Sequence, residues 1–208
     1  MPPAMEEIAV ETTYPINVTL KGGGNVELRP LEGGDEQALI DFFRELPREH
    51  TEFLKHDVKD PDVVRRFIKD RDPDNVWSIL ALADGKIVGD ATLHMHERGW
   101  RRHLGEVRVA VAPTHQKQGV ATTLIRALVN HASIRQLRKL EAQILDSQLD
   151  AHKAFERLGF REGARLKDHA MDLHGGLHDL VILTIAVEDL WRKMEDMISD
   201  MDIGWDRY

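Results

Sequence analysis

The sequence has no cysteine, few aromatic residues and no long apolar run. Without a Cys among its 208 residues, the chain forms neither disulfides nor thiolate metal sites. No apolar run approaches the roughly 20 residues that a membrane-spanning helix needs, so we expect no membrane partner. The N-terminal stretch MPPAMEEIAVETTYP is acidic and lacks the apolar core of a signal peptide. We therefore expect a cytoplasmic protein.

Basic residues are also in short supply. The chain has 28 Lys and Arg against 36 Asp and Glu, for a net charge of −8. A general nucleic-acid binder needs a basic face to displace counterions, so we expect no nucleic-acid partner. Hydrophobic residues make up 42% of the chain, which is typical of a globular protein. The length predicts a single domain over residues 1–208, with a lead-in at 1–15 and a last helix at about 188–201.

Hydrophobic periodicity predicts a mixed α/β fold. Alternation predicts strands and a 3.6-residue period predicts helices, with Pro and Gly marking the ends. The expected strands are 16–20, 26–31, 76–83, 86–94, 106–112, 140–145, 160–166, 167–173 and 180–187. The expected helices start near Asp35, Pro61, Val120, Asp150 and Glu188. This order favours a mixed, mostly antiparallel central sheet flanked by helices.

The most informative stretch is GEVRVAVAPTHQKQGVATTLIRALVNHA, residues 105–132. Val107, Val109 and Val111 alternate with polar or small residues, so we expect a strand that ends at Pro113. From Val120 onward the apolar residues follow a helical period. The polar turn between strand and helix ends directly at the helix N-terminus.

Such a turn suits an anion. The first amides of a helix have no intrahelical partner, and the helix dipole places partial positive charge there. Gly119 lets a ligand approach the backbone and Lys117 adds a charge, so a phosphate or pyrophosphate fits. The Walker pattern G-x-x-x-x-G-K-[ST] and the dinucleotide fingerprint G-x-G-x-x-G are both absent. Taken alone, such a turn is more often an ordinary connection between a strand and a helix.

Residues 116–121 (QKQGVA) match the Q/R-x-x-G-x-G/A signature of the GNAT superfamily of acyl-coenzyme A N-acyltransferases. The preceding Val109-Ala110-Val111 resembles the central strand of that family, and residues 154–160 (AFERLGF) resemble its helix followed by Gly-Phe. The resemblance extends more weakly from about Asn25 to about Val187. It implies a GNAT-like fold and an N-acetyltransferase that moves an acetyl group from acetyl-CoA to a primary amine, by direct transfer in a ternary complex.

The resemblance also implies roles for particular residues. The backbone of Val109, Ala110 and Val111 is expected to hold the pantetheine arm and to polarise the thioester carbonyl. The pyrophosphate is expected on the turn and the start of the helix, formed by Gln116, Lys117, Gln118, Gly119, Val120, Ala121 and Thr122. Two positions beside the cofactor depart from the family. Gln148 stands where an asparagine is common, and Phe155 stands where many members have a tyrosine that protonates the leaving thiolate.

Glu106 is the expected general base, because several GNAT enzymes carry a catalytic glutamate at the start of this strand. An amine must lose its proton before it can attack, and partial burial is expected to raise the pKa of this carboxyl toward neutrality. The alternative is a surface glutamate at a strand end, paired with Arg108.

Other polar clusters leave alternatives open. His94 and His96 lack a third ligand at recognisable spacing, so we expect no metal. His169, His174, His178 and Asp179 form either a polar loop or a wall of the acceptor site, and the acids at 49–60 lie in the other segment that lines acceptor sites in the family. The acceptor is a small-molecule or peptide amine, and the last helix offers a possible homodimer surface. The rival function is a non-catalytic acyl-CoA-binding domain, a sensor or structural relative, which the missing tyrosine favours.

Overall fold

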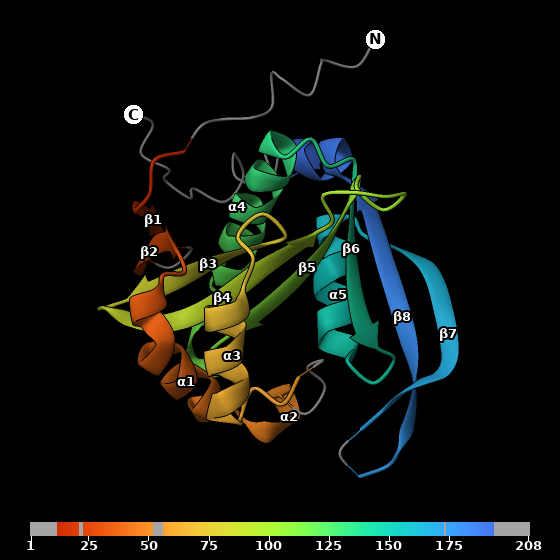
Figure 1. Ribbon diagram of the computed structural model, residues 1–208, viewed down its shortest axis with the longest axis horizontal. Coiled ribbons are helices and arrows are strands. Elements are labelled where there is room, and N and C mark those ends of the chain that lie inside the picture. Colours follow the sequence, from red (N-terminus) through yellow and green to blue (C-terminus); the bar gives the residue numbers. More distant parts are fainter. Residues whose placement is uncertain (1–11, 21–22, 52–55, 173, 194–208) are drawn as a thin grey trace.

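An eight-stranded sheet runs through the computed structural model, which describes residues 12–20, 23–51, 56–172 and 174–193. The strand order is β1-β2-β3-β4-β5-β6-β8-β7, and every neighbouring pair is antiparallel except β5 and β6. The strands are β1 (Ile16–Thr19), β2 (Asn25–Pro30), β3 (Val76–Ala83), β4 (Lys86–Met95), β5 (Leu104–Val111), β6 (Lys139–Leu145), β7 (Arg161–Met171) and β8 (Leu177–Ala186). The expected mixed, mostly antiparallel sheet is confirmed (Figure 1).

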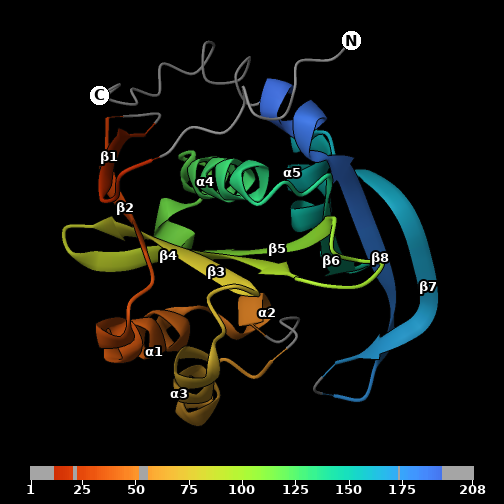
Figure 2. The same cartoon turned by 45° about the horizontal axis from the view of Figure 1, so that its top comes forward.

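Helices cover both faces of the sheet (Figure 2). They are α1 (Glu36–Glu45), α2 (Arg48–Thr51), α3 (Pro61–Asp70), α4 (Val120–Ile134) and α5 (Leu149–Leu158). The cluster with α4 and α5 is the larger core and includes Leu124, Leu128, Leu158 and Phe160, all buried. The cluster with α1 and α3 is smaller and joins Leu39, Phe42 and Val64 to Leu80 of β3. The sheet is therefore the middle of three layers, and its central strands are covered on both sides.

The first two long helices begin where the sequence predicts, but only the second has a capping side chain. Asp60 caps α3 by accepting a hydrogen bond from the Asp62 amide at 2.9 Å, and Pro61 follows at the first helical position. Asp35 precedes α1, but its carboxylate binds the Arg29 guanidinium at 2.6 and 2.7 Å and does not cap the helix. This ion pair ties β2 to the start of α1 and holds the pKa of Asp35 below its usual range.

Two expected strands at the C-terminal end of the chain are one strand. Residues 160–166 and 167–173 were expected to be separate, but β7 runs without a break from Arg161 to Met171. Register shifts against β8 fall between Glu162 and Ala164 and between Leu166 and Ala170. Asp168 has a left-handed φ of 50°, and its amide donates to an Asp179 carboxylate oxygen at 3.1 Å. A bulge thus accommodates the irregular segment within a single strand.

The start of the expected last helix lies within the described residues. Residues 187–193 are helical, with Leu190 fully buried in the larger core and Trp191 partly buried against it. The part of this expected helix at 194–201, and the expected lead-in at 1–11, lie outside the described residues. No described helix is long and apolar enough to cross a membrane.

Candidate active site

Strands β5 and β6 meet at one end and then separate, as Figure 1 shows. Their parallel register covers only Leu104 to Glu106 of β5, paired with Lys139 to Glu141 of β6. From Val107 to Val111 no described residue of β6 is in register with β5, although β4 pairs with this stretch on the other side. One edge of the β5 backbone is therefore available to hydrogen-bond a ligand between the two strands.

The turn after β5 leads to the N-terminus of α4. Gly119 occupies the N-cap position with a left-handed φ of 100°, which favours glycine, and Lys117 has a φ of 61°. Two side chains fasten the turn to the segment before it. The Gln116 amide donates to the Val111 carbonyl at 3.2 Å, and the Gln118 amide donates to the Thr114 carbonyl at 2.8 Å.

The amides of the first turn of α4 remain for an anion. They lack an intrahelical partner by the geometry of a helix, and Val120, Ala121 and Thr122 provide them. Ala121 and Thr122 are half-buried, so the backbone here is close to the surface. The arrangement fits the phosphate site that the sequence predicts.

Gln148 precedes α5, and Phe155 lies within this helix. Gln148 is the residue before α5, and its side-chain oxygen accepts a hydrogen bond from the Leu145 amide at 2.9 Å. This contact leaves the side-chain NH₂ to donate. Phe155 is half-buried and packs edge-on against Phe160, with the ring centroids 5.0 Å apart. It carries no acidic proton, so its described role is packing.

Glu106 lies on the face of β5 opposite to Val107 and Val109, as alternation predicts. Its carboxylate accepts a hydrogen bond from Arg108 Nε at 2.7 Å, and its side chain is only 15% exposed. The predicted ion pair is present, yet the group is mostly removed from solvent. The guanidinium favours the ionised carboxylate, which is the form that accepts a proton.

A cavity of about 110 Å³ lies next to this strand, between the sheet and the α3 layer. Its floor comes from β4 and β5, and its roof comes from α1, α3 and the segment before α3. The residues that line it are Phe43, His56, Val58, Val63, Val64, Phe67, Asp90, Thr92, His94, Arg108, Val109 and Ala110. The cavity therefore brings polar side chains of the sheet to the backbone that is expected to hold the pantetheine arm.

Asp90 is the buried acid of this floor. It is the register partner of Ala110 on β5, and its side chain is on the face that carries Glu106 and Arg108. The Oδ1 atom is buried and has no hydrogen-bond partner among the described residues. Burial raises the pKa of Asp90 to about 7, against the opposing charge of Arg71. Sequence reasoning missed this residue, because an acid that alternates with apolar residues is also typical of a solvent-facing position.

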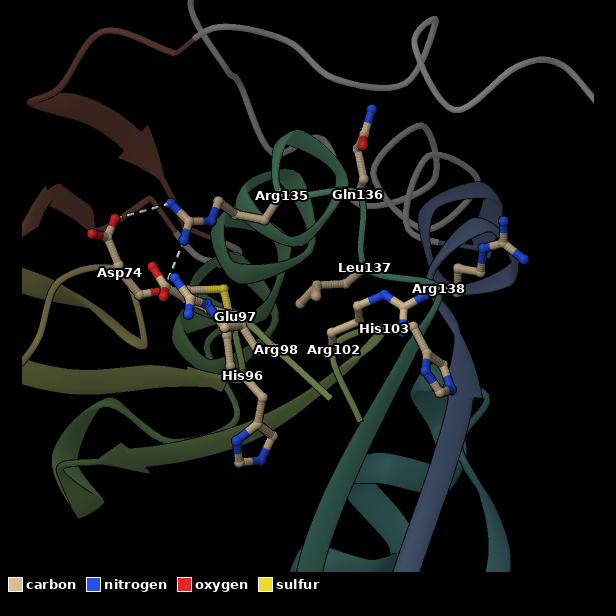
Figure 3. Close-up of a pocket in the computed structure, with 11 residues that line it drawn as sticks. Asp74, His96, Glu97, Arg98, Arg102, His103, Arg135, Gln136, Leu137 and Arg138 are labelled. Carbon is tan, nitrogen blue, oxygen red and sulfur yellow. Dashed lines mark hydrogen bonds and ion pairs between the residues drawn. The ribbon is translucent and has the colours of Figure 1, made fainter. Parts of the chain in front are cut away.

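A larger hollow lies at the other end of β5. It measures about 790 Å³ and is lined by Asp74, Met95, His96, Glu97, Arg98, Arg102, His103, Arg135, Gln136, Leu137 and Arg138. Figure 3 shows Arg135 bound to Asp74, with the guanidinium donating to the Asp74 backbone carbonyl at 2.7 Å, while Gln136 and Arg138 point away from it. These residues lie before β5 and after α4, so the hollow is far along the strand from the turn at 116–119. We assign the chemistry to the smaller cavity because it includes Val109 and Ala110.

The remaining polar clusters are mainly structural in the described residues. Asp172 closes the β7–β8 turn by accepting from the His174 and Gly176 amides, each at 2.8 Å, and binds His178 Nε2 at 3.0 Å. This pairing lowers the pKa of Asp172 to about 2 and raises that of His178. In the other expected acceptor segment, Asp57 accepts from the Lys59 amide and Asp60 caps α3. No group of three or more metal-ligating side chains lies among the described residues.

Comparison with known proteins places the chain in a family. Residues 39–160 match the family model described as the acetyltransferase (GNAT) family. No match was found among curated proteins. Solved structures share the fold at low sequence identity. One of them is a GNAT-family acetyltransferase from Streptococcus pneumoniae. It has a TM-score of 0.67 and 20% identity, over 77% of this chain and 99% of that one.

Two further solved structures are known with an activity or a bound cofactor. A ribosomal-protein-alanine N-acetyltransferase from Brucella melitensis has a TM-score of 0.66 and 22% identity, over 76% of this chain and 98% of that one. A putative acetyltransferase from Salmonella typhimurium was solved with its cofactor acetyl-CoA. It has a TM-score of 0.67 and 20% identity, over 78% of this chain and 94% of that one. The family model covers more than half of the residues, and the fold agrees with it. The chain belongs to the GNAT acetyltransferase family.

Proposed function

We propose that this protein is an N-acetyltransferase that moves an acetyl group from acetyl-CoA to a primary amine, by direct transfer in a ternary complex. One observation carries the proposal. The edge of β5 from Val107 to Val111 has no registered partner on β6 among the described residues, and the chain then continues into the N-terminus of α4. A ligand with an extended amide-containing arm and a pyrophosphate fits this combination. Acetyl-CoA has both parts, and its thioester supplies the activated acetyl group.

The chain's own residues bind and orient this ligand. Backbone groups of Val109, Ala110 and Val111 hydrogen-bond the arm along β5. Amides at the start of α4, from Gly119 to Thr122, hold the pyrophosphate with the help of the helix dipole. The positive charge of Lys117 adds to this attraction. The side-chain NH₂ of Gln148 is a further donor at the mouth of the opening.

Glu106 takes the proton from the amine, directly or through a water. Its carboxylate is mostly buried, accepts a hydrogen bond from Arg108 Nε and lies on the face of β5 that lines the acceptor cavity. A positioned base of this kind contributes roughly 10²–10⁴-fold to the rate. The acceptor is a small-molecule or peptide amine.

The test is Glu106→Gln, which keeps the shape and removes the basicity. We expect kcat to fall by at least about 10²-fold while the acetyl-CoA dissociation constant hardly changes. The wild-type rate should rise with pH through an ionisation that the variant lacks. Glu141→Gln is the matched control, because Glu141 is the register partner of Glu106 on β6 and is held by Arg101 at 2.6 Å. If Glu106→Gln keeps its kcat and pH profile, the base is another group.

The rival is a domain that binds acyl-CoA without catalysis, and the phenylalanine at position 155 favours it. Release of free CoA in the presence of a panel of amines separates the two. The absence of cysteine makes a thiol reagent suitable, because the protein itself gives no signal. Tight binding of acetyl-CoA without CoA release from any amine class would support the rival.

A further inference from the structure

The buried carboxyl of Asp90 has no evident structural task. Its Oδ1 atom is buried without a hydrogen-bond partner among the described residues, although burying an unpaired polar group costs free energy. Asp90 lies in the middle of β4, in register with Ala110, and lines the cavity beside β5. A residue that served only the fold would be expected to have its oxygens paired. The position therefore points to a partner that comes from outside the chain.

The neighbouring cations already have other contacts. Arg108 lines the same cavity, and its guanidinium binds Glu106 at 2.7 Å. Arg71, at the end of α3, donates to the Leu31 carbonyl at 3.0 Å and acts on Asp90 only through its charge. His56 and His94 are the other titratable groups of the cavity, one from the segment before α3 and one from β4 itself. Among the described residues, no cation is hydrogen-bonded to Asp90 Oδ1.

The roof of the cavity is apolar. Phe43 of α1 and Val63, Val64 and Phe67 of α3 face the polar floor. The volume of about 110 Å³ equals the space of about three or four water molecules. It has room for one charged head with a short carbon stem. An aliphatic ammonium ion is complementary to this cavity. Its charge would contact the polar floor, and its methylene groups would pack against the apolar roof.

We propose that the Asp90 carboxylate binds the acceptor as its ammonium ion, and that the acceptor is an aliphatic amine whose carbon stem packs under α3. This inference rests on the proposed function, because it assigns the cavity to the acceptor. Asp90 recognises the charged amine next to Ala110, and the proton then leaves to Glu106 before the nitrogen attacks. The role of Asp90 is thus to select and position the acceptor.

The test uses n-butylammonium chloride as the probe and n-butanol as its neutral counterpart. Binding to the full chain is measured by NMR titration in the presence of CoA. We expect wild type to bind the ammonium at least about tenfold more tightly than the alcohol, and Asp90→Asn to lose that preference. Binding of the ammonium should strengthen as pH rises toward 8, because Asp90 ionises near pH 7 while the alkylammonium stays protonated. The acetyl-CoA dissociation constant should be the same in both proteins.

Asp84→Asn is the matched control, because it removes the same charge from the exposed turn between β3 and β4. Asp90→Asn should fold, since it keeps the side-chain shape and removes a buried charge, and a thermal melt checks this. A wild type without preference for the ammonium overturns the inference, and so does a preference that persists in Asp90→Asn. If acetyl-CoA itself does not bind, the proposed function fails. If it binds but the ammonium preference does not depend on Asp90, only the inference about Asp90 fails.

Discussion

Glu106 and Glu141 are register partners on two parallel strands, and each has its own arginine. Arg108 holds the first at 2.7 Å and Arg101 holds the second at 2.6 Å. Two carboxylates so placed would repel each other without these cations. Each arginine thus offsets the charge of one of the two acids on this face of the sheet. The difference between them is position, because only Glu106 belongs to the strand whose free edge faces the opening.

Two substitutions test whether catalysis needs a proton donor at position 155. Phe155→Leu removes the aromatic ring, and Phe155→Tyr adds a hydroxyl group. A CoA thiol resembles a free cysteine, with a pKa of about 8.5, so its thiolate is a tolerable leaving group near neutral pH. We therefore expect Phe155→Leu and Phe155→Tyr both to keep kcat within about threefold of wild type. A threefold change corresponds to less than about 1.4 kcal/mol at the barrier, the value for a tenfold change. Steady-state kinetics measures kcat, and circular dichroism checks that packing against Phe160 survives.

Two results would contradict this expectation for Phe155. A loss of several hundredfold in Phe155→Leu with an intact fold would show that the position does more than pack. A large gain in Phe155→Tyr would show that the wild-type enzyme lacks a proton donor that limits its rate.

Single residues were predictable where local chemistry decides their position. The φ of 100° at Gly119 and the face of Glu106 follow from a turn before a helix and from strand alternation. Asp90 was not predictable, because burial depends on α1 and α3 folding over β4. The residues next to Asp90 in the sequence do not indicate that these helices will cover it.

At the scale of elements, the opening between β5 and β6 depends on strand pairing. The sequence predicts both strands, but it contains no signal for where their parallel register stops after Glu106. The insertion of β8 between β6 and β7 is likewise a property of the sheet. The two expected strands at 160–166 and 167–173 form the single strand β7, because pairing with β8 resumes after the bulge near Asp168. Long-range pairing, which no local pattern encodes, decides all three.

A negative charge at the N-terminus of α4 tests whether this end of the helix binds the pyrophosphate. Such a charge stabilises the helix but repels the ligand. Ala121 lies in the first helical turn and is half-buried. A glutamate there interacts favourably with the helix dipole, so Ala121→Glu should fold at least as stably as wild type. The same charge repels a pyrophosphate, and we expect the acetyl-CoA dissociation constant to rise at least about tenfold, measured by calorimetry.

Ala121→Gln controls for the size of this side chain, because it has the same shape without the charge. It should bind acetyl-CoA more tightly than Ala121→Glu does. Equal affinity in the two variants would mean that the anion is held elsewhere.

At the scale of the whole molecule, the two faces of the sheet have different tasks. The larger core joins α4 and α5 to β4, β5, β6 and β8, and it supports the strand and turn that are proposed to hold acetyl-CoA. The smaller core joins α1 and α3 to β3 and β4, and it forms the roof over the acceptor cavity. The two proposed substrates therefore approach β5 between different layers. This arrangement suits direct transfer, since both meet at one strand.

The stability of the whole fold should depend on pH through His131. This side chain is on α4 and stacks on Trp77 of β3, with the rings 4.2 Å apart and 4° from parallel. Its Nε2 atom is buried without a hydrogen-bond partner among the described residues, and burial lowers the pKa of His131 to about 4. Between about pH 6.5 and pH 4 the unfolded chain therefore binds a proton at this residue that the folded chain does not. The contribution of His131 to stability is present above pH 6.5 and is lost as the pH falls.

The variant His131→Phe keeps a ring against Trp77 and cannot titrate. We expect the free energy of unfolding, measured by urea at pH 7.5 and pH 5, to fall less in this variant than in wild type. One proton gives a slope of at most about 1.4 kcal/mol per pH unit, so the two slopes should differ by less than that. Asp90 acts in the opposite direction, because its raised pKa adds stability at low pH that is lost as the pH rises from 3.8 through about 7. The double variant His131→Phe/Asp90→Asn removes both effects, so its stability should change less between the two pH values than that of either single variant.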